Sequence, residues 1–286
     1  MYARSDALLN AFDLIKAGKI MLGQLQQRRV YYDLIGDAGA PAVCLIHAMM
    51  ADGSMWSPQV PDLLKAGFRV LRMDLPGHGG SAASSEPSTM ADLADGVISL
   101  LDHLEISKTH YCGLSIGGAI GQALAIHNAD RLESLFLADT VSAAPPGARG
   151  MWAERLKAVE AAGSLAPLAD MTMSRVVSAA FKEKNPALWM GLRDTILGTE
   201  PLGLAQCAHA LAEFDFTASL PNVRIPTQIV CGDDDPATPP AEGKKIASLI
   251  PGSVYAEIRN ARHYPNVEQP EQFNAVLLQW LRSRTA

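Results

Sequence analysis

The sequence is short of positive charge and of cysteine. Its 286 residues contain 24 lysines and arginines against 30 acidic residues, for a net charge of −6. Nucleic-acid binding requires a basic surface, so nucleic acid is excluded as a partner. The four cysteines (Cys44, Cys112, Cys207 and Cys231) form no CxxC pair and have no zinc spacing, so we expect neither a metal site nor a disulfide. Scattered free thiols favour a reducing, cytoplasmic location.

A long uninterrupted apolar run is also missing. The longest, Ala42–Ala51, contains His47 and is far shorter than the ~20 residues of a membrane-spanning helix. The N-terminal segment carries Asp6 and Asp13, where a secretory signal would be apolar. We therefore expect no membrane span. The apolar residues of the N-terminal segment are spaced as on an amphipathic helix, so residues 1–23 are predicted to form an N-terminal helical extension. This helix would pack on the body of the protein or on a second subunit, which leaves a homodimer open.

The rest of the chain alternates between short apolar runs and helical patterns, which is typical of an α/β fold with a mostly parallel, helix-flanked sheet. Strand-like runs lie at 24–29, 30–34, 42–47, 68–73, 109–113, 132–138, 227–231 and 254–258. These eight runs predict an eight-stranded sheet. Residues 141–221 have only helical stretches bounded by proline and glycine, so we predict a helical cap there. The core would then comprise residues 24–140 and 222–286.

A G-x-S-x-G motif, Gly113-Leu114-Ser115-Ile116-Gly117, stands between a predicted strand and a predicted helix. A sharp strand-to-helix turn strains the serine backbone, and glycines two positions on either side let neighbouring chains pass. The motif predicts Ser115 as a nucleophile at the carboxyl edge of the sheet. The N–H of Ile116, at the start of the helix, would point at a developing oxyanion.

A base and an acid are expected after the last two strands, because this arrangement places the acid and then the histidine after the serine. His263 follows the strand-like run 254–258 and is the predicted base. Three aspartates, Asp233, Asp234 and Asp235, follow the run 227–231. Asp235, just before Pro236, is the preferred acid. Asp234 is the next candidate, and Asp139, after the run 132–138, is an outside one.

The second oxyanion donor should come from the loop after the run 42–47, which reads His47-Ala48-Met49-Met50. The Met49 N–H is the candidate, although Ala48 stands where glycine is usual. Apolar and aromatic side chains of this loop and of the cap would line the substrate pocket: Met50, Trp56, Trp152 and Trp189, with His209 as a polar contact. Four cap arginines (Arg149, Arg155, Arg175 and Arg193) could bind a substrate carboxylate.

Several of these segments resemble the α/β-hydrolase superfamily. They are Asp74-Leu75-Pro76-Gly77-His78-Gly79, the Ser115 motif, Asp235-Pro236-Ala237-Thr238-Pro239-Pro240 and His263 with Asn266-Val267-Glu268-Gln269-Pro270. Together with Ser54-Met55-Trp56-Ser57-Pro58-Gln59 they are similar to the 3-oxoadipate enol-lactonase branch. The resemblance covers residues 24–284 and implies a cofactor-free hydrolase with Ser115, Asp235 and His263 as its triad. Arg262 departs from the pattern, because glycine or alanine often precedes the histidine.

The expected function is therefore hydrolysis of a lactone or carboxylic ester of a small, largely apolar substrate, through an acyl-enzyme on Ser115. Hydrolysis of a carbon–carbon bond in a β-diketone-like substrate is an alternative on the same fold. Haloalkane cleavage fits less well, because that reaction needs an aspartate nucleophile where this chain has Ser115. A non-catalytic ligand-binding module is a further alternative.

Overall fold

A sheet of eight strands forms the centre of the molecule in this computed structural model, which describes residues 18–25 and 28–284, with side chains from residue 29 on. The strand order is β1-β2-β4-β3-β5-β6-β7-β8. Strands β3 to β8 run parallel to one another, whereas β2 pairs antiparallel with both β1 and β4. The bounds are β1 Gly18–Leu25, β2 Arg28–Ile35, β3 Ala42–Ile46, β4 Arg69–Met73, β5 Thr109–Leu114, β6 Leu132–Ala138, β7 Thr227–Gly232 and β8 Val254–Ile258.

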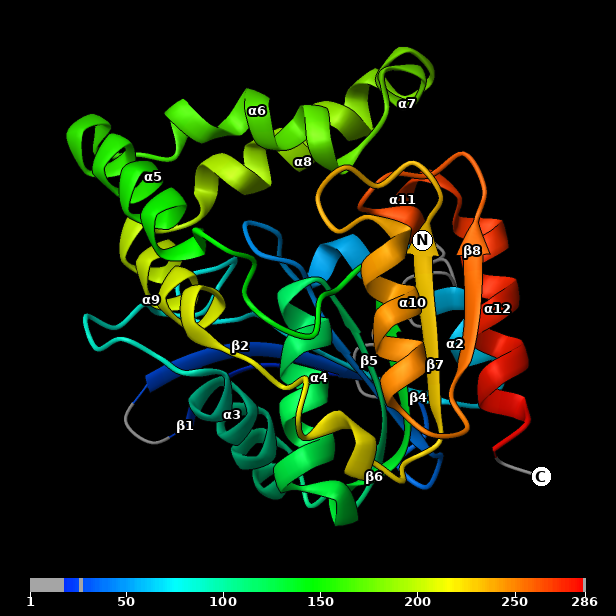
Figure 1. The fold of residues 1–286 in the computed structure, drawn as a ribbon. Coiled ribbons are helices and arrows are strands. Elements are labelled where there is room, and N and C mark those ends of the chain that lie inside the picture. The colour runs from blue at the N-terminus through cyan, green and yellow to red at the C-terminus, as the bar shows by residue number, and fades with distance from the viewer. Residues whose placement is uncertain (1–17, 26–27, 285–286) are drawn as a thin grey trace, which may run out of the picture.

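Helices cover both faces of this sheet (Figure 1). Helices α3 (Met90–His103), α4 (Ile116–His127) and α10 (Pro240–Leu249) lie on one face, and α2 (Val60–Lys65) and α12 (Pro270–Arg282) lie on the other. Strands β3, β5 and β7 are buried along their whole length, as expected of parallel strands that are covered on both faces. The first ten residues of α4 are buried too, because this helix packs on β5 and β6 and against α3.

Five helices are inserted between β6 and β7 and lie beyond the carboxyl ends of the parallel strands (Figure 1). They are α5 Ala148–Ala162, α6 Ala166–Val176, α7 Ala179–Lys184, α8 Pro186–Gly198 and α9 Pro201–Glu213. We call them the helical insertion. Proline begins α8 and α9, where its missing N–H removes no intrahelical bond. These five helices lie within residues 141–221, the stretch for which the sequence predicts a helical cap.

The N-terminal prediction needs correction. Residues 1–17 of the predicted helical extension lie outside the described residues, but its last part is a strand. Gly18–Leu25 pairs antiparallel with Arg28–Ile35 along eight residues. A short isolated helix is marginal in water, whereas this strand joins the edge of an existing sheet, so pairing with β2 outweighs the helical spacing of Met21 and Leu22.

The four cysteines are free and buried, as expected of small apolar side chains. Within the described part of the chain, none of the helices has the length and apolar character needed to cross a membrane.

Candidate active site

Ser115 occupies a strained turn between β5 and α4. Its backbone has φ 58° and ψ −114°, a left-handed conformation that a non-glycine residue adopts only when its surroundings impose it. The neighbouring glycines make the turn possible. A Cβ on Gly113 would lie 2.2 Å from the Gly117 carbonyl oxygen, and one on Gly117 would lie 2.3 Å from the Ile46 oxygen. Both atoms are backbone, so only glycine fits at these two positions.

The ends of β6 and α4 hold this turn in place. The Ser115 N–H donates to the Ala138 oxygen at 2.9 Å. The Ser115 carbonyl accepts from the Thr140 hydroxyl at 2.7 Å and from the Ala119 N–H at 3.0 Å. Because its main-chain groups are bonded to protein, the hydroxyl is left as the group that lines the cavity above the sheet.

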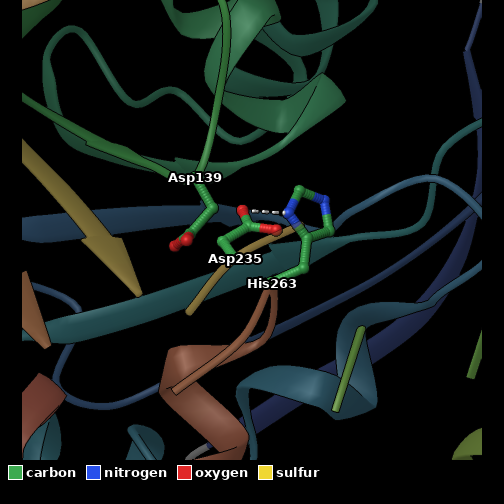
Figure 2. Close-up of side chains that lie close together, drawn as sticks. All are labelled: Asp139, Asp235 and His263. Carbon is green, nitrogen blue, oxygen red and sulfur yellow. Dashed lines mark hydrogen bonds and ion pairs between the residues drawn. The ribbon is translucent and has the colours of Figure 1, made fainter. Parts of the chain in front are cut away.

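The predicted base and the preferred acid meet at the carboxyl ends of β8 and β7. His263 Nδ1 lies 2.8 Å from Asp235 Oδ2, and both side chains are buried (Figure 2). Asp235 Oδ1 accepts from the Ala237 N–H at 2.7 Å, and Oδ2 also accepts from the Thr238 hydroxyl at 2.6 Å. The sequence analysis places Thr238 in a family-like segment but predicts no role for it, although its place three residues after the acid was a usable signal.

These donors keep Asp235 charged. Burial alone would raise its pKa, but the positive charge on His263 and the hydrogen bonds from His263, Thr238 and Ala237 outweigh burial and lower it. A charged Asp235 accepts the Nδ1 proton of the imidazole, so Nε2 is the nitrogen left to accept a proton. His263 and Ser115 line the same cavity, of about 210 Å³. Within the described residues, no hydrogen bond joins Ser115 Oγ to His263 Nε2, a pairing that often tightens only with substrate.

The alternative acids have other contacts. Asp233 accepts from the Ala261 N–H at 3.3 Å, and Asp234 lies 3.2 Å from Arg262 Nε. Both are exposed. Asp139, by contrast, is fully buried beside Asp235, but it is Asp235 that is bonded to the imidazole.

The loop after β3 and the start of α4 carry the two predicted oxyanion donors. Met49 lines the cavity beside Ser115, and Ile116 begins α4, where the first N–H groups have no intrahelical acceptor. The positive φ of this loop, 61°, falls on Met50 and not on Ala48. Alanine at position 48 therefore causes no backbone strain. His47 braces the loop by contacting the Ala48 oxygen through Nδ1 at 2.7 Å and accepting the Leu75 N–H at Nε2 at 2.8 Å.

Two of the five predicted pocket side chains lie in this cavity. Met50 and Trp152 line it, together with Met171 of α6 and Phe214 after α9. They give the cavity an apolar lining.

The other three predicted pocket side chains do not line this cavity. Trp56 is fully buried and packs against Phe273, with ring centroids 6.0 Å apart, so it belongs to the core below. Trp189 lies away from the cavity, and the Lys182 ammonium is 4.1 Å from the centroid of its indole ring. His209 is exposed, with Nδ1 3.2 Å from the Ser88 oxygen. The periodicity of a helix indicates its apolar face but not which part of that face meets the cavity.

Two of the four arginines named from the sequence, Arg155 and Arg175, line the cavity. Burial and the positive charge of Arg175 lower the pKa of Arg155, whose guanidinium lies 4.9 Å from the Trp152 ring centroid. Arg175 donates to the Pro236 oxygen at 3.2 Å. Neither forms an ion pair with a carboxylate of the described residues. Arg149 and Arg193 instead pair with Glu213 and Asp170.

A metal would have to compete with the acid–base pair. Among the described residues, Asp139, Asp235 and His263 form the one group whose ligand atoms lie close enough to hold an ion, within 4.8 Å of one another. Two of these three residues are already bonded to each other at 2.8 Å. Binding of an ion there would break the bond that fixes the imidazole.

Known proteins resemble the chain along most of its length. 3-Oxoadipate enol-lactonase 1 from Acinetobacter baylyi is 34% identical over 264 residues, 92% of this chain and 97% of that protein. The crystal structure of an enol-lactonase from Burkholderia xenovorans LB400 matches with a TM-score of 0.87 at 32% identity, covering 91% and 99% of the two chains. A malate-bound thermophilic esterase from Thermogutta terrifontis matches with a TM-score of 0.85 at 30% identity, covering 91% and 95%.

The alpha/beta hydrolase fold family matches residues 41–270, which include every strand from β3 to β8 and the loops that carry Ser115, Asp235 and His263. Since this match spans well over half of the sequence, the chain belongs to the α/β-hydrolase fold family.

Proposed function

We propose that the chain hydrolyses a lactone or carboxylic ester of a small molecule through an acyl-enzyme on Ser115, with His263 as base and Asp235 as acid. The observation that carries the proposal is the bond between His263 and Asp235 at the edge of the cavity that Ser115 also lines. The broader class, lactone or ester hydrolysis, follows from the family and its enol-lactonase relatives. We place the reaction in the cytoplasm, in keeping with four free, buried cysteines.

The mechanism follows from the positions of these groups. His263 Nε2 takes the Ser115 proton as Oγ attacks the substrate carbonyl, and the charged Asp235 stabilises the imidazolium that forms. The N–H groups of Ile116 and Met49 receive the negative charge that develops on the carbonyl oxygen. Collapse of the tetrahedral intermediate breaks the ester bond, and the imidazolium returns its proton to the leaving oxygen. Water, deprotonated by the same imidazole, then releases the acid.

The cavity favours a small substrate that is apolar at one end and anionic at the other. Met50, Trp152 and Met171 supply apolar surface, and the helical insertion acts as a cap over the nucleophile. Arg155 and Arg175 add two positive charges without a carboxylate partner among the described residues. Arginine pairs bidentately with carboxylates, so we propose a substrate carboxylate at this pair. A 3-oxoadipate enol-lactone, the internal ester of a dicarboxylic acid, keeps one carboxylate free and fits this description.

The first experiment measures turnover by the purified protein of short p-nitrophenyl esters, a panel of lactones and a β-diketone. Wild type should hydrolyse the esters and lactones, and Ser115→Ala should lower kcat by roughly 10³-fold or more. A fluorophosphonate probe should label wild type but not Ser115→Ala. Undiminished turnover in Ser115→Ala would refute the serine mechanism, and preferred cleavage of the β-diketone would favour carbon–carbon hydrolysis.

The second experiment tests the carboxylate. A lactone with a free carboxylate is compared with its neutral methyl ester in wild type, Arg175→Gln and Arg149→Gln. Arg175→Gln should raise KM for the anionic lactone about tenfold and leave KM for the neutral lactone nearly unchanged. Arg149→Gln is the matched control, because Arg149 lies in the helical insertion but outside the cavity. Equal losses for both lactones would contradict a carboxylate site.

A further inference from the structure

A second buried carboxyl group lies beside the triad acid. Asp139 follows β6 directly and is fully buried. An oxygen of Asp139, an oxygen of Asp235 and a ring nitrogen of His263 lie within 4.8 Å of one another. Figure 2 shows the Asp139 side chain next to that of Asp235, on the side away from the imidazole. The Asp139 backbone has φ 43°, which costs a non-glycine residue about 1 kcal/mol or more, so its surroundings hold it in this place.

The hydrogen bonds of Asp139 are incomplete for an anion. Oδ1 accepts the Gly232 N–H at 2.8 Å. Oδ2 is buried and has no partner among the described residues. An ionised carboxylate can only accept hydrogen bonds, and the neighbouring Asp235 is another carboxylate, which can only accept them too. Two buried anions placed side by side repel each other strongly.

A single proton on Asp139 resolves both problems. A protonated carboxyl has one O–H donor, and the adjacent Asp235 carboxylate is an acceptor. The other titratable groups that face Asp139 are Glu268, Cys231 and His263. Of these, only His263 can carry a positive charge, and its Nδ1 is already bonded to Asp235. Burial raises the pKa of Asp139 well above its usual range, and the charge of Asp235 raises it further.

We propose that Asp139 is a positioning residue that carries a proton at neutral pH and donates it in a hydrogen bond to Asp235. This role rests on the function proposed above, in which Asp235 is the triad acid. The added donor helps to keep Asp235 ionised and turned towards His263. Because Asp139 is neutral, it provides this support without adding a second negative charge. A second anion near the imidazole would favour the imidazolium and remove the free base from Ser115 at neutral pH.

Two substitutions of Asp139 separate these roles. Asparagine keeps the shape, with an oxygen for Gly232 N–H and an amide donor for Asp235. We expect Asp139→Asn to keep kcat/KM for a p-nitrophenyl ester within about threefold, with the acid limb of the pH profile unmoved. Asp139→Ala should lower kcat about tenfold and move the acid limb to higher pH, because Asp235 has lost a donor. An acid limb that moves to lower pH in Asp139→Asn would overturn the proposal, because it would show that a negative charge had been removed.

Infrared spectroscopy detects the proton on the Asp139 carboxyl without any need for turnover. The difference spectrum of wild type minus Asp139→Asn at neutral pH should contain the C=O stretch of a protonated carboxyl. Ser115→Ala minus the Ser115→Ala/Asp139→Asn double variant should contain the same band, so the result stands apart from the fate of the serine mechanism. Absence of the band in both differences would overturn the proposal, even if Asp139→Ala failed to fold.

Discussion

The backbone N–H of Tyr264, the residue after the predicted base, donates to the Val176 carbonyl at the end of α6, at 3.0 Å. Val176 itself lines the cavity. Glu268 joins the same two segments, since its carboxylate accepts both the Ser178 N–H at 2.9 Å and the Arg262 N–H at 2.6 Å. The loop that positions the imidazole is therefore bonded directly to the helical insertion that shapes the pocket.

Arg262 is part of this junction. Its contacts here suggest a purpose for an arginine at a position where the family often has glycine or alanine. Its guanidinium donates to the Ser174 oxygen and lies 3.2 Å from Asp234. We expect Arg262→Ala to loosen the end of α6, which carries Arg175, and so to raise KM about threefold to tenfold with kcat little changed. Steady-state kinetics on the anionic lactone measures both constants.

Arg259→Ala is the matched control for this variant, because Arg259 belongs to the same loop and is exposed. It should behave like wild type. A fall in kcat at constant KM in Arg262→Ala would instead mean that Arg262 acts on the chemistry of His263.

Thr238 supports the acid through its hydroxyl, 2.6 Å from Asp235 Oδ2. Thr238→Val keeps the shape and removes this donor. Hydrogen bonds to charged groups contribute about 1.5–3 kcal/mol, so kcat/KM should fall at least about tenfold. The donor lowers the pKa of Asp235. Its loss makes Asp235 more basic and favours the imidazolium, so the acid limb of the pH–rate profile should move to higher pH.

Thr195→Val serves as the control for Thr238→Val, because the Thr195 hydroxyl bonds within its own helix, to the Gly191 oxygen at 3.0 Å. Its pH–rate profile should match that of wild type. A Thr238→Val enzyme with reduced activity but an unmoved acid limb would show that Thr238 matters only for folding of the loop.

Two glycines with different surroundings test the packing of the serine turn. Gly117→Ala would place a methyl group 2.3 Å from the Ile46 oxygen, which is backbone and cannot rotate away. We expect a loss of about 3 kcal/mol or more in the free energy of unfolding, together with loss of activity. Gly191, within α8, has nothing within 4 Å of an added Cβ. Gly191→Ala should therefore raise stability by about 0.5–1 kcal/mol.

Urea denaturation of the two glycine variants measures both effects on one scale. If Gly117→Ala were as stable as wild type, the backbone of β3 and α4 would have to separate more easily than their packing indicates.

The parts of the candidate site that depend on local geometry could be predicted from the sequence. Ser115 lies in a strand-to-helix turn whose glycines are required by backbone contacts within a few residues or with the adjacent strand. His263 and Asp235 follow strands that pair side by side, so strand order alone brings their loops together. The pocket was less predictable. Trp189 and His209 lie on helices of the helical insertion. The packing of these helices against each other decides which side of each helix faces the cavity, and the local sequence does not reveal that packing.

The neutral form of Asp139 also predicts how stability depends on pH. The folded pKa of Asp139 is raised, whereas an unfolded aspartate titrates near pH ~3.9. Its contribution to stability is therefore complete below about pH 4 and is lost as pH rises towards the folded pKa, because only the folded state keeps the proton. One retained proton lowers the free energy of unfolding by up to about 1.4 kcal/mol per pH unit.

Urea unfolding of wild type and Asp139→Asn between about pH 5 and pH 8 measures this slope. Asparagine binds no proton in either state, so the stability of Asp139→Asn relative to wild type should rise with pH. Asp215→Asn is the control: hydrogen bonds from Thr217 lower the pKa of Asp215, so its linkage lies below about pH 4 and should leave no slope in this range. A difference in the free energy of unfolding between wild type and Asp139→Asn that stayed constant with pH would mean that Asp139 is ionised in the folded state. The proposed proton on Asp139 would then be wrong.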